Sequence, residues 1–164
     1  MSVQTRCRFG HIRAILLGSI LLAALDVAFA AFTMTEIVPP SLGMVLSGAS
    51  GRNFILNTDE SVTGADAIDY ISGAVSGQLS LLKTRGPADV DIVAENILPS
   101  GGLTVNAVPC RFDTDPQTTC DGAGINVRVH RDQTLYVGID FTTSQVHNSG
   151  DTASVTYDIN VIFP

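Results

Sequence analysis

Apolar side chains occupy every second position of the segment TASVTYDINVIFP (152–164). One face of this segment carries five of them: Val155, Tyr157, Ile159, Val161 and Phe163. The opposite face is polar, and this alternation predicts a half-buried β-strand. Burying five such side chains is worth roughly 8–15 kcal/mol before entropy costs, comparable to the ~5–15 kcal/mol net stability of a domain. We therefore expect the domain to require this strand, and its outer edge to be covered or offered to a partner.

The same period of two recurs along most of the chain, and no helical period of useful length appears. Strands are expected at 32–38, 53–57, 77–83, 88–94, 103–108, 125–130, 134–141 and in the final segment. Glycine- and serine-rich turns separate them. About eight short strands at this spacing predict an all-β fold, an antiparallel β-sandwich. An eight-stranded barrel is the alternative, and the only candidate helix is a turn within 60–70.

Two of the expected strands indicate which side chains face the core. In TLYVGIDF the inward positions are Leu135, Val137, Ile139 and Phe141. In INVRVH, Val127 and Val129 are expected to point inward, and Asn126, Arg128 and His130 toward water. One packed face per strand is what a two-layer sandwich requires.

The first thirty residues have the pattern of a secretory signal peptide. A basic head with Arg6, Arg8 and Arg13 precedes the apolar run AILLGSILLAAL, and Ala28 and Ala30 form an A-x-A cleavage site. The apolar run, which we expect to be the signal-peptide helix, is short for a bilayer span; an uncleaved membrane anchor is the alternative. The expected organisation is a signal peptide (1–30) followed by one domain (31–164), with no membrane span after cleavage.

The charge of the chain limits its partners. Because the leader carries three arginines and one aspartate, its removal takes the formal charge from −7 to −9. Such a surface repels phosphate groups, so neither nucleic acid nor polybasic membrane attachment is expected.

Two cysteines remain after the leader, Cys110 and Cys120, at the ends of CRFDTDPQTTC. In an exported chain they predict one disulfide bond. A metal site is the alternative, although two cysteines without a nearby histidine make a poor zinc ligand set.

No catalytic machinery is apparent, and we expect neither an enzyme nor a cofactor. No G-x-S-x-G elbow occurs, and neither His130 nor His147 has a ligand partner at i+2 or i+4. A pair of catalytic carboxylates stays open, because a glycosidase needs only two. The segment FDTDPQTTCDG makes Asp113, Asp115 and Asp121 a weak calcium candidate. It departs from the EF-hand pattern, and a solvated loop is the alternative.

Three longer runs together resemble a family of bacterial exported all-β domains of unknown function: LGMVLSGASGRNFILNTDESVTGADAIDYISGAVSGQLSLL, ADVDIVAENI and TLYVGIDFTTSQVHNSGDTASVTYDINVIF. The matching positions are Leu42-Gly43, 77–82, Leu135-Tyr136-Val137-Gly138 and 155–163. Ile139 stands where the family usually has glycine, and the Cys110–Cys120 loop is similar to an insertion.

The closing pattern is also similar to spore-coat-U and archaic chaperone–usher pilin subunits. That resemblance implies an immunoglobulin-like, pilin-like sandwich that is a subunit of a secreted fibre or coat. A periplasmic chaperone would bind the C-terminal strand of each subunit, and the N-terminal strand of a neighbouring subunit would complete its sheet. The possible donor segment places Phe32 and Met34 on one face. A strong donor carries four or five apolar residues at this spacing. A self-contained periplasmic or cell-surface binding module is therefore the alternative function.

Overall fold

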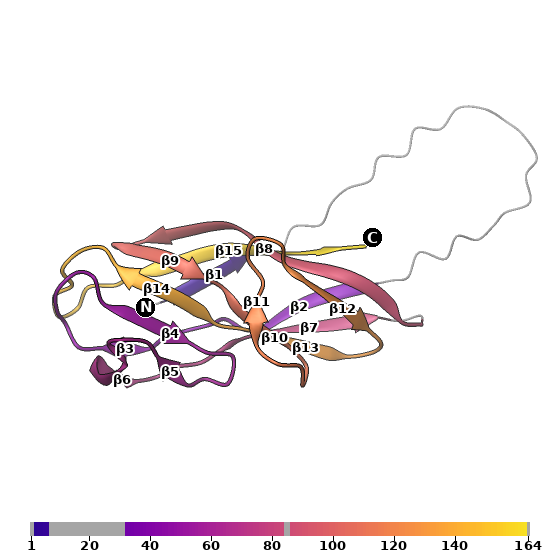
Figure 1. Cartoon of the computed structure of the whole chain (residues 1–164), viewed down its shortest axis with the longest axis horizontal. Helices are drawn as coiled ribbons and strands as arrows, with labels where there is room; N and C mark the ends of the chain where they lie inside the picture. The colour runs from indigo at the N-terminus through magenta and orange to yellow at the C-terminus, as the bar shows by residue number, and fades with distance from the viewer. Residues whose placement is uncertain (1, 7–31, 84–85, 164) are drawn as a thin grey trace, which may run out of the picture.

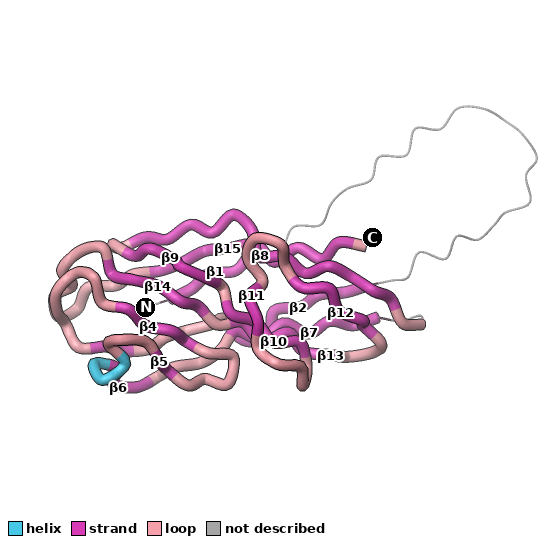
Figure 2. The backbone as a smooth tube through the Cα atoms, viewed as in Figure 1, coloured by secondary structure: helices cyan, strands magenta, loops and turns pink. Residues whose placement is uncertain are grey.

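The computed structural model describes residues 2–6, 32–83 and 86–163, and its regular elements are almost all β-strands, joined by turns and loops (Figure 1). The one helical element among them is the 3₁₀ turn η1 (Ala67–Asp69), drawn in cyan in Figure 2. Apart from one parallel pair, the strands in the sheets are antiparallel. The expected all-β, antiparallel class is confirmed.

The first sheet has the order β1-β15-β8-β12. Its strands are β1 (Ser2–Arg6), β15 (Ser154–Ile162), β8 (Ala88–Ser100) and β12 (Ile125–Val129). β8 pairs antiparallel with both β15 and β12, whereas β1 pairs parallel with β15. The longest strand, β8, therefore lies at the centre of this sheet with β15.

The second sheet has the order β11-β10-β13-β7-β2. Its strands are β11 (Thr118–Thr119), β10 (Pro109–Phe112), β13 (Gln133–Val137), β7 (Gly77–Lys83) and β2 (Phe32–Val38). β2 is one of the two edge strands and pairs only with β7 among the described strands.

The third sheet continues from the second through Gly138. Its strands are β5 (Val62–Thr63), β4 (Asn53–Leu56), β14 (Ile139–Thr143) and β9 (Leu103–Ala107), in that order. Separately, β3 (Met44–Val45) pairs with β6 (Tyr70–Ser72).

Gly138 lies between β13 and β14, where the backbone of β4 comes very close. A Cβ added at Gly138 would lie 2.0 Å from the carbonyl oxygen of Leu56, far inside van der Waals contact. Its N–H also donates to the carbonyl of Pro109 at 2.7 Å. Glycine lets the strand pass from one sheet to the next at this close approach.

Side chains from all three sheets form one buried cluster. β13 and β14 contribute the expected inward residues Leu135, Val137, Ile139 and Phe141. From β15 come Val155, Tyr157 and Ile159, each at most 1 % exposed. Val127 and Val129 are buried as expected, and Asn126, Arg128 and His130 are exposed. The alternation read from the sequence therefore predicts the core face correctly.

All eight expected strands are present, with two differences in extent. The segment 134–141 is broken at Gly138, and the strand expected at 88–94 runs on to Ser100. The short strands β3, β5, β6, β10 and β11 were not predicted, because runs of two to four residues are too short to show a period.

The expected leader falls mostly outside the described residues. Residues 7–30, including the apolar run expected to be helical and the cleavage site, belong to this part. Ser2–Arg6, expected within the basic head, forms strand β1. Within the described part of the chain, no helix has the length and apolar character needed to cross a bilayer.

Two positions on β15 should differ sharply in their contribution to stability. Ile159 is fully buried, whereas Phe163 is 49 % exposed just after the strand. We expect Ile159→Ala to lower the free energy of unfolding by about 2–5 kcal/mol, because it opens a cavity in the core. Phe163→Ala should cost about 1 kcal/mol or less. Urea denaturation of both variants measures this; equal losses would contradict the burial of β15.

Gly138→Ala should destabilise the protein by about 1–3 kcal/mol, because the methyl group cannot fit against the Leu56 carbonyl without a backbone shift. Gly122→Asn is the control: no atom lies within 4 Å of its added Cβ, and asparagine tolerates the φ of +70° there. The control should stay within about 0.5 kcal/mol of the parent in the same denaturation experiment. A Gly138→Ala variant as stable as the parent would contradict the close approach of the Leu56 carbonyl to Gly138.

Candidate functional site

The first candidate site is the edge of β15 that faces away from β8. On this edge the backbone pairs in parallel with β1, from Ser2 opposite Ser154 to Arg6 opposite Asp158. The inner side chains of β15 are buried in the core. The groups that β15 presents along this edge are therefore its backbone N–H and C=O groups. A strand from elsewhere can recognise such an edge through main-chain hydrogen bonds.

The five residues expected to form the assembly strand do not behave alike. Val155, Tyr157 and Ile159 are fully buried, Val161 packs at the margin of the core, and Phe163 is half exposed. The apolar side chains on the inner face are thus buried at the start of the strand and become more exposed to solvent toward its end.

A bulge interrupts the pairing of β15 with β8 at Tyr157. The register shifts between Thr156 and Asp158, and the extra residues on β8 include Asn96, whose φ is +51°. Asn96 Nδ2 donates to Asp158 Oδ2 at 2.8 Å. Two residues farther along β15, Asn160 Nδ2 donates to Glu95 Oε2 at 2.7 Å. These bonds across the polar face hold β15 in one register on β8.

The possible donor segment forms β2, and here it pairs with β7 of its own chain. Met34 packs against the core, while the side chain of Phe32 lies outside the described residues. The pairing is irregular at Glu36, where the register shifts. Glu36 Oε1 is buried and has no hydrogen-bond partner in the described part of the chain. A buried carboxylate oxygen without a partner is costly, so Glu36 lowers the contribution of this edge strand to stability.

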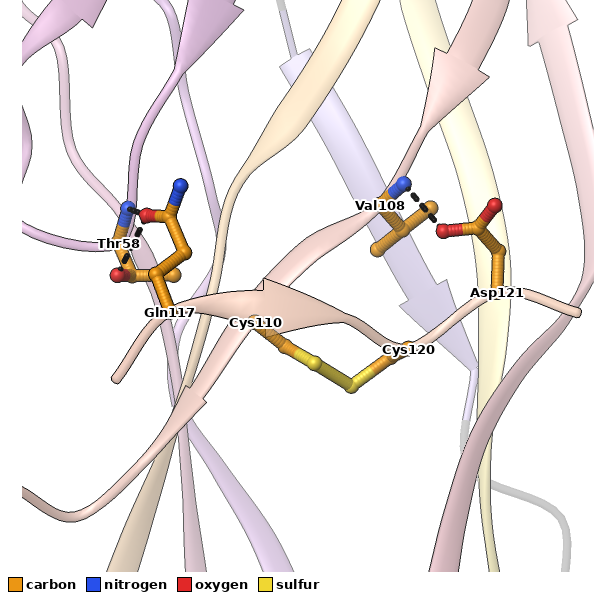
Figure 3. Close-up of a disulfide and its surroundings, with 6 residues drawn as sticks. All are labelled: Thr58, Val108, Cys110, Gln117, Cys120 and Asp121. Carbon is orange, nitrogen blue, oxygen red and sulfur yellow. Dashed lines mark hydrogen bonds between the residues drawn. A yellow bond between two sulfur atoms is a disulfide. The ribbon is translucent and has the colours of Figure 1, made fainter. Parts of the chain in front are cut away.

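The predicted disulfide between Cys110 and Cys120 is present, and both residues are fully buried (Figure 3). It ties β10 to the end of the loop that follows. The Cys120 N–H donates to the Val108 carbonyl at 2.9 Å, and the Ala94 N–H donates to the Cys120 carbonyl at 2.8 Å. Because Ala94 lies on β8, this loop links the first sheet to the second.

Two polar side chains anchor the same loop on either side of the disulfide (Figure 3). Asp121 Oδ1 accepts a hydrogen bond from the Val108 N–H at 2.8 Å. Gln117 Oε1 accepts from the N–H of Thr58 at 2.9 Å and from its hydroxyl at 2.8 Å. In the neighbouring turn, hydrogen bonds from the hydroxyl and N–H of Ser61 hold the pKa of the exposed Asp59 carboxyl below its usual value.

The calcium candidate receives no geometric support. Among the described residues, no three acidic, histidine or cysteine side chains are grouped closely enough to hold a metal ion. Asp113 has a φ of +50° and its carbonyl accepts from Arg111 Nη1, whereas Asp121 caps the Val108 N–H. The D-x-D pattern here belongs to a hydrogen-bonded loop.

A second candidate site was not predicted from the sequence. A cavity of about 520 Å³ lies between the loops 43–49 and 147–153. Its lining includes Arg52, Phe54, Phe141 and His147, which are brought together only by the pairing of β4 with β14 and by loop contacts. His130, the other histidine considered, is exposed and is not part of this lining.

Comparisons with known proteins give no relative for this chain: no family model, no curated protein and no solved structure matches it.

Removing the disulfide should weaken the domain. The bond closes a loop with a sequence separation of 10, for which loop entropy predicts a loss of about 2–3 kcal/mol. We expect the double variant Cys110→Ala/Cys120→Ala to show this loss in urea denaturation, and the reduced parent protein to show a similar one. Mass spectrometry with and without reductant checks the bond itself. Identical unfolding midpoints for the oxidised and reduced protein would contradict a stabilising role.

Proposed function

We propose that this chain is an exported, non-enzymatic structural protein, a pilin-like or coat subunit that assembles by β-strand complementation. Its sheets then form an immunoglobulin-like, pilin-like sandwich, with β15 as the strand whose outer edge is completed by another segment. The partners are further copies of the chain and a periplasmic chaperone and usher. The product is a surface assembly or an extracellular fibre.

The observation that carries the proposal is the parallel pairing of β1 with β15. Antiparallel neighbours can be joined by a tight hairpin, whereas a parallel neighbour needs a long connection or a separate chain. The edge of β15 thus accepts a strand remote in sequence, which is the property strand complementation requires. Cleavage of the expected leader, which contains Ser2–Arg6, would open this edge.

The donor that we propose is the β2 segment of a neighbouring copy. β2 is an edge strand, and among its described side chains only Met34 packs against the core cluster. The buried, unpartnered Glu36 oxygen lowers the cost of detaching this strand. A detached β2 would then add to the open β15 edge of the next copy, which is an exchange of strands between copies.

Two further observations support an exported location. The Cys110–Cys120 disulfide suits an oxidising compartment. The acidic charge of −7 for the whole chain favours a solvated surface and repels nucleic acid.

A self-contained periplasmic or cell-surface binding module is the second candidate. The observation that favours it is the pairing of β2 with β7 within the same chain, by which the chain itself supplies the last strand at this end of the second sheet.

The test is the oligomeric state of the exported protein with and without a functional β2. We expect the parent to form polymers on size-exclusion chromatography. Thr35→Pro should elute as a folded monomer, because proline removes a strand N–H and breaks β2. Deletion of 31–38 should act in the same way, and a synthetic 31–38 peptide should bind the deletion protein.

Thr33→Ser, an exposed position on the same strand, is the matched control and should polymerise like the parent. Near-ultraviolet circular dichroism shows whether the variants stay folded. A parent protein that elutes as a highly stable monomer would overturn strand exchange and favour the self-contained module.

A further inference from the structure

Strand β1 covers part of the β15 edge on which the proposed assembly depends (Figure 1). It pairs with β15 over five residues, from Ser2 opposite Ser154 to Arg6 opposite Asp158, whereas β15 itself has nine residues. On its other side β15 pairs with β8. Between Ser154 and Asp158, β15 therefore lies between two strands and presents no open edge to a third.

The strand that covers this edge is joined to the domain differently from the other strands of the first sheet. β8, β12 and β15 all contribute side chains to the common core. β1 instead belongs to the basic head of the expected leader, before the A-x-A pattern of Ala28 and Ala30. Cleavage after Ala30 would remove β1 and none of the residues of the described core cluster.

The charges at one register position favour the pairing of β1 with β15. Arg6 stands opposite Asp158, and opposite charges at facing positions of neighbouring strands stabilise the pair. The proposed donor strand, β2, has no basic residue, and its one charged residue is Glu36. While β1 is present, the edge at Asp158 therefore favours β1 over the donor.

A strand of the same chain also has an advantage of concentration over a strand from another copy. A tethered segment acts at an effective concentration of ~0.1–1 mM, which is roughly ten- to a hundred-fold above that of separate copies at ~10 μM. For equal pairing strength, the tethered strand therefore occupies the edge in most molecules.

From these observations we propose that Ser2–Arg6 is an autoinhibitory strand. While it stays joined to the domain, it holds the β15 edge and excludes the donor strand of another copy, and its removal starts assembly. This inference rests on the proposed function, because it concerns the regulation of the same edge.

The experiment compares the full chain with its cleaved form. The recognition site of a sequence-specific protease replaces 26–30, so that one purified, oxidised preparation supplies both forms. On size-exclusion chromatography we expect the full chain to be monomeric and the cleaved form to polymerise.

Binding of a synthetic 31–38 peptide is then measured by fluorescence anisotropy in the Thr35→Pro background, where other copies do not fill the edge. The full chain should bind the peptide at least about ten-fold more weakly than the cleaved form, the result expected when nine-tenths of the molecules are capped. Near-ultraviolet circular dichroism shows whether this background stays folded. If it does not, hydrogen–deuterium exchange of the chain without this substitution decides the question.

One pair of variants tests the contact at Asp158. Arg6→Glu in the full chain places like charges at facing positions, so the peptide should bind about two- to five-fold more tightly than to the parent full chain. Arg8→Glu makes the same change of charge outside β1 and is the matched control, which should leave the affinity unchanged.

Hydrogen–deuterium exchange gives a readout that needs no donor strand. Amides of 154–158 should exchange faster in the cleaved monomer than in the full chain, because they lose the strand on one side. Amides of 125–129, which pair with β8, should be unaffected and are the internal control.

The outcomes separate this inference from the function on which it rests. A full chain that polymerises, or that binds the peptide as tightly as the cleaved form does, would overturn autoinhibition and leave strand exchange intact. Equal exchange of 154–158 before and after cleavage would also overturn autoinhibition. A cleaved protein that neither polymerises nor binds the peptide would overturn strand exchange, and autoinhibition with it.

Discussion

The burial of Val155, Tyr157 and Ile159 against the other sheets is the interaction on which the rest of the structure depends. These side chains reach the common core only because β15 pairs with β8 in one register. A slip by one residue would turn the three apolar side chains toward water and Thr156 and Asp158 inward. The bulge at Asn96 and the bonds from Asn96 to Asp158 and from Asn160 to Glu95 fix that register. With the inner face committed, only the backbone edge of β15 remains for a partner strand.

Gly138 and the disulfide loop connect the three sheets around their common core. Gly138 lets a single run of chain contribute β13 to one sheet and β14 to the next. The loop closed by the Cys110–Cys120 disulfide links the second sheet to the first. The backbone of Cys120 forms hydrogen bonds with Val108 and with Ala94 of β8. A covalent bond suits this position, because short strands such as β10 and β11 have few ladder hydrogen bonds of their own.

The sequence predicts the features that depend on local alternation, and it fails where distant segments meet. Leu135, Val137, Ile139 and Phe141 were placed correctly because a half-exposed strand shows its period directly. The disulfide followed from two cysteines in a chain that the sequence predicts to be exported. The D-x-D spacing of Asp113 and Asp115 does not reveal that Asp121, the third residue of the weak calcium candidate, accepts the N–H of Val108. Nor could the cavity be foreseen: Arg52, Phe141 and His147 come from separate segments, and only strand pairing brings them together.

The edge of β15 and the cavity are formed by different residues: the lining of the cavity ends at Ala153, and β15 begins at Ser154. In the structure β1 occupies the edge, with Ser2 opposite Ser154, while the cavity is formed next to Ala153 at the start of β15. Both features therefore exist at the same time in one molecule, and a strand bound along the edge does not fill the cavity. In the proposed assembly the cavity would stay open, because main-chain hydrogen bonds along β15 would join the copies, whereas residues of the two loops and of β4 and β14 line the cavity.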